Sequence, residues 1–491
     1  MFKKLELDEF LALIKPGVQR VLVFQEIMAD RLTPISVFEA LAADLQGGAI
    51  LESGVQQAPA GRYSFLAFEP FARLEFKNGQ TQEYLDGHTT CTSTNPFQRL
   101  PEFIRELSCT CQPEFAEKIN QAMGFITYDS VRLLEDIPDR HSQDEALPEV
   151  LFNFYRITLG FDHEQQKLLI SVLIDVNEAP KQAYVEAQDK IAAIIDKMNA
   201  LSSVSCFQTK TQGALMETQV DISDEDFMHL VERAKEYIKK GDIFQVVLSR
   251  SFKKAFTGKP FDIYRALRQV SPAPYMFYFP LEDRIIVGAS PERMVSVHQG
   301  KISVNPIAGT RRRMDKNEDA QIEKELLSDP KELAEHMMLV DLARNDVGRV
   351  SEIGSVEVEA LAQVKHYSHV SHLTSVVSGK LDPTFHAFDA LSATFPAGTL
   401  SGAPKVRAME LIDELENSRR GLYGGVIGRL DYAGNFDSCI AIRIAVLKDN
   451  VATIRTGAGI VHDSDPYSEA RETRQKASSL LAAFDFSEGV Y

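Results

Sequence analysis

The alternation of apolar and polar positions along the chain predicts a mixture of strands and helices. Short apolar or alternating runs at 21–24, 49–51 and 151–161 are typical of strands, and 167–174 would form the hairpin partner of the third. Residues 181–198 repeat alanine and isoleucine at helical spacing. The first part of the chain is therefore expected to contain both kinds of element.

A change of pattern divides the chain in two. Residues 201–218 have no apolar period and are rich in Ser, Thr and Gln, which is typical of a linker. We therefore predict an N-terminal domain over 1–200, a linker over 201–218 and a larger domain over 219–491.

The larger domain shows a mixed α+β pattern with long antiparallel strands. Asp329-Pro330 opens one of its helices, because proline is favoured in a first turn. The other predicted elements are a helix over 221–240, a strand over 243–249, a hairpin around 299–300, strands within 355–378, a helix over 384–393, a loop over 395–404 that opens a further helix, strands on both sides of 433–434, a strand into 457–459 and a helix from 466.

Charge and composition exclude several classes of protein. The chain has 53 basic and 70 acidic side chains, a net charge of −17, which argues against a nucleic-acid or membrane-surface protein. No apolar run reaches the roughly 18 residues of a membrane span, and the charged start lacks the apolar core of a signal peptide. We therefore expect a cytoplasmic protein.

Cysteine usage and short motifs exclude further chemistry. The five cysteines form no CxxC pair, so free, reduced thiols are expected rather than a zinc or dithiol site. The chain also lacks a P-loop, an HExxH and a GxSxG motif, and it contains no tryptophan. The cysteines are Cys91, Cys109, Cys111, Cys206 and Cys439.

Three histidines at intervals of three suggest a metal site at first sight. Their surroundings favour a strand, on which alternate residues point to opposite faces. On one continuous strand His369 would point away from His366 and His372, so the pattern does not favour a three-histidine metal site. One of the three remains a candidate acid–base group.

Two acidic pairs leave two interpretations open. Glu332 and Glu335, and likewise Glu469 and Glu472, are three residues apart on predicted helices, so each pair shares a face. If the two faces converge, their oxygens suit Mg²⁺; otherwise both pairs are solvated. Small residues at 457–459 could let backbone amides approach an anion, or could form a plain turn.

These pieces, taken in order, resemble the chorismate-utilising enzyme family, and within it the large subunits of anthranilate synthases. The resemblance is strong over about 220–485 and implies large antiparallel sheets packed together and flanked by helices. Its motifs are FQVVLSR at 244–250, GASPE at 288–292, PIAGTR at 306–311, ELAEH at 332–336, DLARND at 341–346, HVSH at 369–372, GTLSGAPK at 398–405, YGG at 423–425, IR at 442–443, GAG at 457–459 and SEARETR at 468–474.

The resemblance implies Mg²⁺ bound by Glu335 and Glu472, with Glu332 and Glu469 as supporting acids. A cation is reasonable there, because chorismate is a dianion entering an acidic protein. The resemblance also implies a set of substrate-binding residues: Gly309, Thr310, Tyr423, Arg443, Gly457, Ala458, Gly459 and Lys476.

Family members differ in the nucleophile that attacks the ring. Members that add water carry a lysine base where this chain has Gln245, which can only form hydrogen bonds, so ammonia is expected instead. Aminodeoxychorismate synthases often carry a lysine nucleophile where this chain has Ala308. Glu292 matches the acid that protonates the departing hydroxyl, and His372, with Thr399 as a weaker candidate, would assist the elimination of pyruvate.

The resemblance therefore implies that chorismate and ammonia give anthranilate and pyruvate, the first step of tryptophan biosynthesis. A separate glutaminase subunit would supply the ammonia, in a heterotetramer of two large and two small subunits, because no cysteine here lies in a nucleophile motif. The alternatives are component I of aminodeoxychorismate synthase, which Ala308 counts against, and a catalytically silent regulator that binds chorismate or tryptophan.

Feedback inhibition by tryptophan is a further implication. The resemblance places the inhibitor on Glu52-Ser53 and on Pro274, Tyr275 and Met276, which belong to different predicted domains. Without the resemblance, Ser53 would simply end a strand and 275–279 would be ordinary core.

Overall fold

The computed structural model describes residues 2–54, 61–107, 109–142, 147–176, 179–200, 217–313, 319–366 and 370–488. The strands before residue 200 are β1 (Arg20–Met28), β2 (Ala49–Glu52), β3 (Tyr63–Lys77), β4 (Gln80–Leu85), β5 (His88–Thr92), β6 (Asn120–Ile126), β7 (Val150–Asp162) and β8 (Lys167–Asp175). The helices of this part are α1 (Leu7–Leu13), α2 (Pro34–Ala42), α3 (Pro96–Glu106), α4 (Pro113–Ala116) and α5 (Pro180–Asn199).

After residue 216 the strands are β9 (Thr218–Val220), β10 (Gln245–Ala255), β11 (Tyr275–Pro280), β12 (Ile285–Ser290), β13 (Arg293–His298), β14 (Lys301–Val304), β15 (Ile307–Arg312), β16 (Glu357–His366), β17 (Val370–Lys380), β18 (Gly402–Ala403), β19 (Val426–Asp431), β20 (Phe436–Ile440), β21 (Ile444–Lys448) and β22 (Val451–Ile460). The helices are α6 (Asp224–Lys240), α7 (Pro260–Val270), α8 (Asp319–Ser328), α9 (Pro330–Gly348), α10 (Ala387–Thr394), α11 (Lys405–Leu415) and α12 (Pro466–Glu488).

Local sequence signals set several of these boundaries. The Ser223 hydroxyl accepts a hydrogen bond from the Asp226 N–H at 3.1 Å and so caps α6, which ends at Gly241 in the left-handed conformation (φ +83°). Strands β7 and β8 form an antiparallel hairpin, as the alternating pattern predicts. The predicted helices over 181–198 and from 329 are confirmed as α5 and α9.

The strands form two arms that spread from the N-terminal part of the chain. One arm runs β3–β2–β11–β12–β21–β22–β10 and the other runs β7–β6–β19–β20–β13–β14–β17, with antiparallel pairing throughout. Side chains of both arms meet in a buried layer that includes Phe125, Phe277 and Ile427. The expected α+β fold with packed antiparallel sheets is therefore confirmed.

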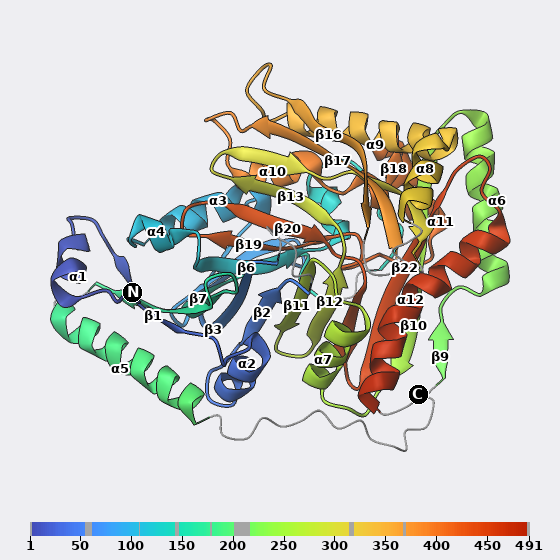
Figure 1. Ribbon diagram of the computed structural model, residues 1–491. Helices are drawn as coiled ribbons and strands as arrows, with labels where there is room; N and C mark the ends of the chain where they lie inside the picture. The colour runs from blue at the N-terminus through green and yellow to red at the C-terminus, as the bar shows by residue number, and fades with distance from the viewer. Residues whose placement is uncertain are drawn as a thin grey trace.

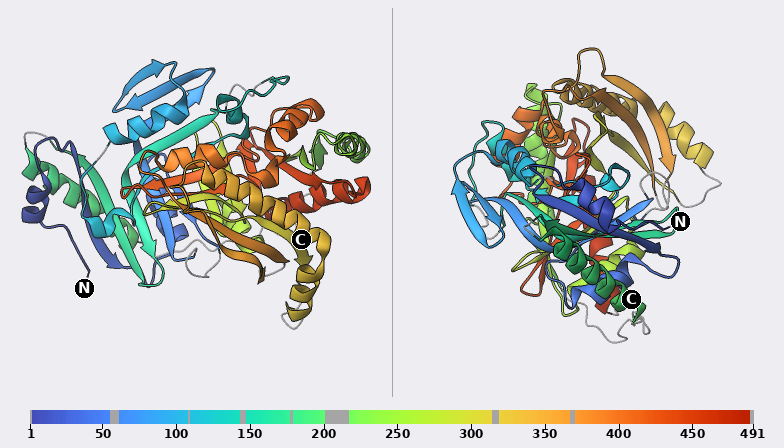
Figure 2. Two further views of the ribbon diagram at one scale, coloured as in Figure 1. Left: turned by 90° about the horizontal axis from the view of Figure 1, so that it is seen from above. Right: turned by 90° about the vertical axis from the view of Figure 1, so that its left-hand side faces the viewer.

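Helices cover the outer faces of the two arms. In Figure 1, α12 lies along β10 and β22, whereas α9 lies over β16 and β17, and the views in Figure 2 agree with this arrangement. Helix α5 packs against β8 at the other end of the molecule. No helix in the described ranges is long and apolar enough to cross a membrane.

Two predictions about chain organisation have different outcomes. The domain boundary stays a prediction, since 201–216 lie outside the described residues, although β9 begins at Thr218 and pairs with β10. The single strand assumed for the three histidines is wrong. His366 ends β16, His372 lies on β17, and the chain reverses between them to pair the two strands. His369 lies outside the described residues.

Candidate active site

Glu292 and Arg443 lie where the chain crosses from one arm to the other. Glu292 stands between β12 and β13, and Arg443 stands between β20 and β21. The Ile440 N–H donates to the Glu292 carbonyl at 3.0 Å, and the Ala289 N–H donates to the Arg443 carbonyl at 3.0 Å. Each connection is thus hydrogen-bonded to a strand next to the other connection, which holds Glu292 and Arg443 in the same region of the fold.

The Glu292 carboxyl has the environment of an acid that keeps its proton near neutral pH. Burial raises its pKa to about 7, opposed by a hydrogen bond from Thr399 and by the charge of Lys476. The Thr399 hydroxyl, in a short 3-10 turn over Gly398–Leu400, donates to Glu292 Oε1 at 2.8 Å. The structure therefore brings the predicted acid and Thr399 into direct contact.

Gln245, the first residue of β10, is 5% exposed and makes one contact of chemical interest. Its Nε2 donates to Glu335 Oε1 at 3.1 Å, which joins β10 to α9. Its Oε1 is buried, and no donor in the described part of the chain reaches it. A buried carbonyl oxygen without a donor is costly and marks a place where a ligand N–H could bind.

Lys476 joins helix α12 to strand β22. Its Nζ lies 2.7 Å from Glu472 Oε1 and donates to the Gly457 carbonyl at 2.9 Å. A Cβ added to Gly457 would lie 2.7 Å from the Tyr423 hydroxyl, so glycine permits this approach. Burial raises the pKa of Tyr423 to about 12, with the negative charge of Glu472 adding to the rise.

Residues 457–459 form part of β22 rather than a loop or turn. Gly457, Ala458 and Gly459 pair with Ser249, Leu248 and Val247 of β10. Ala458 is fully buried, and a Cβ on Gly459 would lie 3.0 Å from Gln245 Nε2. The expectation of a turn is corrected: the glycines make room inside a strand, where side chains from β10 and from Tyr423 approach the backbone.

His372 faces the bulge in β15 at Gly309. It pairs with Thr310 across the strands, and its Nδ1 lies 3.3 Å from the Gly309 carbonyl. Burial lowers the pKa of His372, and the positive charge of Arg443 lowers it further. His372 is therefore a neutral imidazole near pH 7. The Thr310 side chain lies outside the described residues.

His366 does not share this position. It pairs with Ser371 and its Nδ1 lies 2.8 Å from the Ser371 hydroxyl, whereas His372 pairs with Lys365. Cross-strand partners share a face and sequence neighbours do not, so His366 and His372 point to opposite faces of the β16–β17 pair.

The four predicted acids differ in their partners. Arg311 Nη1 donates to Glu332 Oε1 at 2.7 Å, so Glu332 is held by an ion pair, and Glu335 is held by Gln245. Glu469 lies in the first turn of α12, one turn before Glu472. Among the described residues no group of three or more His, Cys, Asp or Glu side chains is arranged to hold a metal. The donor chemistry fits a hard cation that takes its other ligands from water or substrate.

The predicted inhibitor residues meet at the junction of the two halves. Met276 of β11 pairs with Glu52 of β2, and the Gly54 N–H donates to the Ala273 carbonyl at 2.8 Å. Met276 is fully buried, and the Arg293 Nε donates to the Tyr275 hydroxyl at 2.8 Å. A pocket of about 800 Å³ opens beside these segments; its lining includes Glu52, Ser53, Gly54, Arg62, His163, Arg265 and Arg268.

Sequence reasoning missed the residues that support these segments. Arg268 Nε lies 2.7 Å from Glu52 Oε1, and the Tyr264 hydroxyl donates to the same oxygen at 2.5 Å. Glu416 and Arg420 form a buried ion pair behind the site, although the run at 416–420 looks like a solvated charge cluster in the sequence. The only sequence signal that could have indicated the burial of Glu416 and Arg420 is the presence of apolar residues among the charged ones at 411–422.

Comparison with known proteins decides the family. A model of the chorismate binding enzyme family matches residues 51–482. The chain belongs to that family. Anthranilate synthase component 1 of Acetivibrio thermocellus is 42% identical over 471 residues, which cover 94% of this chain and 95% of that protein. The corresponding protein of Bacillus caldotenax is 40% identical, covering 96% and 94%.

Solved structures agree with this assignment. Anthranilate synthase component I from Streptococcus pneumoniae is 36% identical, with a TM-score of 0.75, and the match covers 93% of this chain and 99% of that one. The menaquinone-specific isochorismate synthase of Escherichia coli shares the fold at 18% identity, with a TM-score of 0.71 over 97% and 98%. The chain is thus an enzyme of the chorismate-binding class, and the resemblance stated from its motifs is confirmed.

Proposed function

We propose that this chain is the synthase subunit of an anthranilate synthase, which converts chorismate and ammonia to anthranilate, pyruvate and water. The observation that carries the proposal is the pairing of a protonated acid with a neutral amide. Glu292 has a pKa of about 7 and can donate a proton, and Gln245 presents a buried oxygen where other family members have a basic lysine. This pair suits ammonia as the nucleophile and hydroxyl as the leaving group.

Binding of the chorismate dianion would rest on the cationic and small residues of the site. Arg443 offers a fork that matches a carboxylate, and Lys476 adds a second positive charge beside Gly457. The glycines at 309, 457 and 459 leave backbone close to the substrate, with Ala458 between the last two and Tyr423 over Gly457. Thr310 completes the proposed set of substrate contacts.

Mg²⁺ would be held by Glu335 and Glu472, with Glu332 and Glu469 one helical turn away. Both carboxylates are hard oxygen donors, and each is oriented by a neighbour, Gln245 for Glu335 and Lys476 for Glu472. When bound, the cation neutralises the charge of a substrate carboxylate among these acids. We therefore propose that the chain requires Mg²⁺ for activity.

The proton movements follow from the placement of three side chains. Gln245 Oε1 accepts an N–H of ammonia and so orients its lone pair toward the ring. Glu292 gives its proton to the departing ring hydroxyl, which leaves as water. The Glu292 carboxylate then takes back the extra proton of the newly bound amine. His372, neutral near pH 7, takes the ring proton and passes it to the methylene carbon of the departing enolpyruvyl group, so that pyruvate is released and the ring becomes aromatic. One ammonia enters, and one water and one pyruvate leave.

The ammonia would come from a glutaminase subunit. Burial raises the pKa of the Cys109 and Cys439 thiols well above their usual range and that of Cys111 to about 11, so these thiols are not activated nucleophiles. Phe244, next to Gln245, is 69% exposed, and its N–H bonds the Ala403 carbonyl near the 41% exposed Val406. We propose that the glutaminase binds at this apolar surface, in an assembly of two large and two small subunits.

The test is product analysis with the purified chain, chorismate, ammonium and Mg²⁺. Fluorescent anthranilate is the expected product, and it should disappear in excess EDTA. Glu335→Gln should lower turnover at least 100-fold with the fold intact. Asp341→Asn is the matched control, because Asp341 is an exposed acid on the same helix, paired with Arg344. A stable ring aminated at carbon 4, the product of the rival synthase, would overturn the proposal, as would full activity without Mg²⁺.

A further inference from the structure

Glu416, Arg420 and Arg455 form a buried cluster of one carboxylate and two guanidinium groups, which bonds the backbone next to Thr399 and on β10. Arg420 Nη2 donates to Glu416 Oε1 at 2.6 Å, and Arg455 Nη2 donates to Glu416 Oε2 at 2.8 Å. The Ser249 N–H and hydroxyl also donate to Glu416 Oε1, each at 2.8 Å. Burial alone would raise the pKa of Glu416, but the two arginines outweigh it and hold the pKa below its usual range. Glu416 is therefore ionised.

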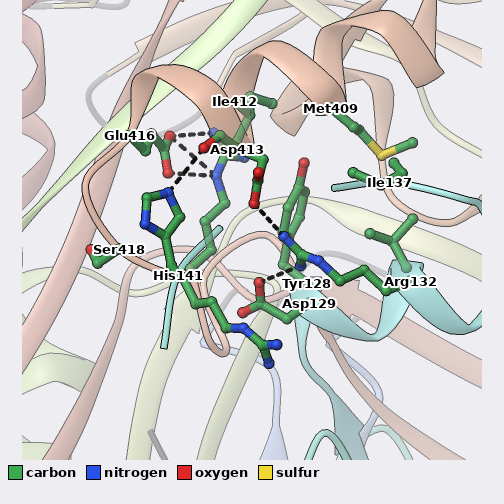
Figure 3. A pocket seen from close by; sticks show the side chains of 13 residues that line it. Tyr128, Asp129, Arg132, Ile137, His141, Met409, Ile412, Asp413, Glu416 and Ser418 are labelled. Carbon is green, nitrogen blue, oxygen red and sulfur yellow. Dashed lines mark hydrogen bonds and ion pairs between the residues drawn. The ribbon is translucent and has the colours of Figure 1, made fainter. Parts of the chain in front are cut away.

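Arg420 reaches beyond this pair to two backbone carbonyls. Its Nη1 donates to the Leu400 carbonyl and its Nη2 to the Val247 carbonyl, both at 2.6 Å. Its guanidinium lies 4.6 Å from the centre of the Tyr128 ring and 5.7 Å from that of Tyr423. Figure 3 shows the small pocket in which Glu416 and Tyr128 lie together.

The two carbonyls belong to segments that carry catalytic groups. Leu400 follows Thr399 in the 3-10 turn, and Thr399 donates to the Glu292 carboxyl. Val247 lies on β10, two residues after Gln245. Arg420 thus fixes the turn that holds the acid relative to the strand that holds the amide, and no other side chain in the described ranges donates to both carbonyls.

Arg420 bonds two backbone carbonyls in addition to the Glu416 carboxylate. Replacing a buried ion pair by apolar residues of similar size is often neutral or stabilising, because desolvation of the charges offsets their attraction. The rigid guanidinium fork is suited to fixing two acceptors at a set separation, which the single nitrogen of lysine cannot do. The contacts of Arg420 therefore set the separation of the Leu400 and Val247 carbonyls, whatever the ion pair contributes to stability.

We propose that Arg420 is a positioning residue of the reaction, which places the Thr399 hydroxyl and through it the Glu292 carboxyl. This inference rests on the proposed function, in which Glu292 donates a proton. Lys476 is the charge that acts on Glu292 directly, whereas Arg420 is joined to the acid through the Leu400 carbonyl and the Thr399 hydroxyl. The effect should therefore appear in the acid step.

The test is the Arg420→Lys variant, assayed with saturating ammonium across pH. We expect kcat to fall by up to about 10-fold, no more than in Thr399→Val, while KM for chorismate changes less than about threefold. Loss of the Thr399 donor removes an interaction that favours the carboxylate, so the pKa of Glu292 rises and the fall in activity moves to higher pH. Thr399→Val should give the same shift, and the double variant should be no worse than Thr399→Val alone.

Arg455→Lys is the matched control. Arg455 binds the same Glu416 carboxylate, and its other contacts are Ser249, Ser418 and the Arg419 carbonyl, not the turn at Leu400. It should lower the melting temperature without moving the pH profile. Should Arg420→Lys fail to fold, Glu416→Gln keeps both arginines and should shift the profile in the same direction by less.

Three outcomes are distinguishable. An unchanged pH profile in Arg420→Lys, or additive effects with Thr399→Val, overturns the inference while the proposed function stands. An equal shift in Arg455→Lys also overturns it, because the shift would then not require the contact with the turn at Leu400. If the wild-type chain forms no anthranilate, the proposed function fails instead.

Discussion

The Glu292 carboxyl differs from an exposed glutamate because water has been replaced by protein atoms around it. Desolvation favours the neutral acid, and the Thr399 donor and the Lys476 charge only partly restore the carboxylate. A general acid must be protonated to act, so the proposed chemistry should be lost as pH rises through the pKa of about 7. The stability that the protonated acid contributes to folding is lost as pH rises from the ordinary glutamate pKa of 4.5 through about 7.

Thr399→Val tests this assignment. Removing the hydroxyl takes away a donor that favours the carboxylate, so the pKa of Glu292 should rise. The alkaline fall of kcat/KM should then move to higher pH, while kcat drops about 10-fold through lost orientation. A pH series with ammonium as substrate measures both. Thr394→Val is the control, since the Thr394 hydroxyl is buried and donates only to helix carbonyls; a similar shift there would contradict the assignment.

His372→Met tests the elimination step. Nδ1–H of His372 faces the Gly309 carbonyl, which leaves Nε2 as the basic nitrogen of a neutral ring. Methionine fills a similar volume without a base, so amination should continue and an aminated, non-aromatic intermediate should accumulate. Chromatography of the reaction products measures it. His366→Met is the control, because His366 points to the other face of the strand pair. If neither step is slower in His372→Met than in the wild type, this histidine has only a structural role.

At the scale of elements, β15 reaches the site through a bulge that only glycine fills easily. Gly309 has φ +56°, and a Cβ there would lie 3.1 Å from Glu332 Oε2 and 3.2 Å from Leu326 Cδ2. The bulge turns the β15 backbone so that the Gly309 carbonyl meets His372. The glycine therefore links strand geometry to the position of His372, the proposed base.

Gly309→Ala should cost both stability and substrate affinity. We expect a loss of about 1–3 kcal/mol from the left-handed backbone and the crowded Cβ. KM for chorismate should rise, because Glu332 and the β15 backbone must move. Thermal unfolding and steady-state kinetics measure the two effects. Gly300→Ala is the control: its φ is +75° but nothing lies within 4 Å of an added Cβ, so it should lose stability alone.

The sequence predicts the elements better than their connections. Apolar periods locate α5 and the β7–β8 hairpin, and the proline of Asp329-Pro330 locates the start of α9, because those signals are local. The antiparallel pairing of β16 with β17 is missed, since polar histidines and serines continue the strand pattern from one into the other. The site residues come from motif resemblance; the contact of Thr399 with Glu292 spans 107 positions and has no local signal.

At the scale of the whole molecule, the N-terminal part is built into the same sheets as the site. Strand β2 pairs with β11, and β6 pairs with β19, so both arms begin among N-terminal strands. Asp413 on α11 adds an ion pair with Arg132 at 2.7 Å. A pattern of apolar positions cannot reveal such pairing, because it depends on strands more than 200 residues apart in the chain. A ligand between β2 and β11 could therefore act on both arms.

We predict that L-tryptophan inhibits the chain at this junction and that Ser53→Phe relieves the inhibition. Ser53 follows β2 directly and lines the pocket of about 800 Å³, and β2 pairs with β11 at Met276. A bound ligand that bridges β2 and β11 would change the position of these strands relative to β12, and so the position of Glu292, which follows β12. Phenylalanine would fill the space of the ligand, so half-inhibition should require at least 10-fold more tryptophan.

Anthranilate formation with ammonium and rising L-tryptophan measures the effect, and fitting against chorismate concentration separates competition from cooperativity. Thr89→Phe is the control, because it adds the same ring at an exposed position of β5, away from this pairing. Calorimetry without chorismate measures tryptophan binding directly. Binding should weaken in Ser53→Phe and should be unchanged in Thr89→Phe. If wild type keeps full activity at millimolar tryptophan, or if both variants stay equally sensitive, the junction has no such role and the catalytic assignment is unaffected, because it depends on Glu292, Gln245 and His372 and not on Ser53.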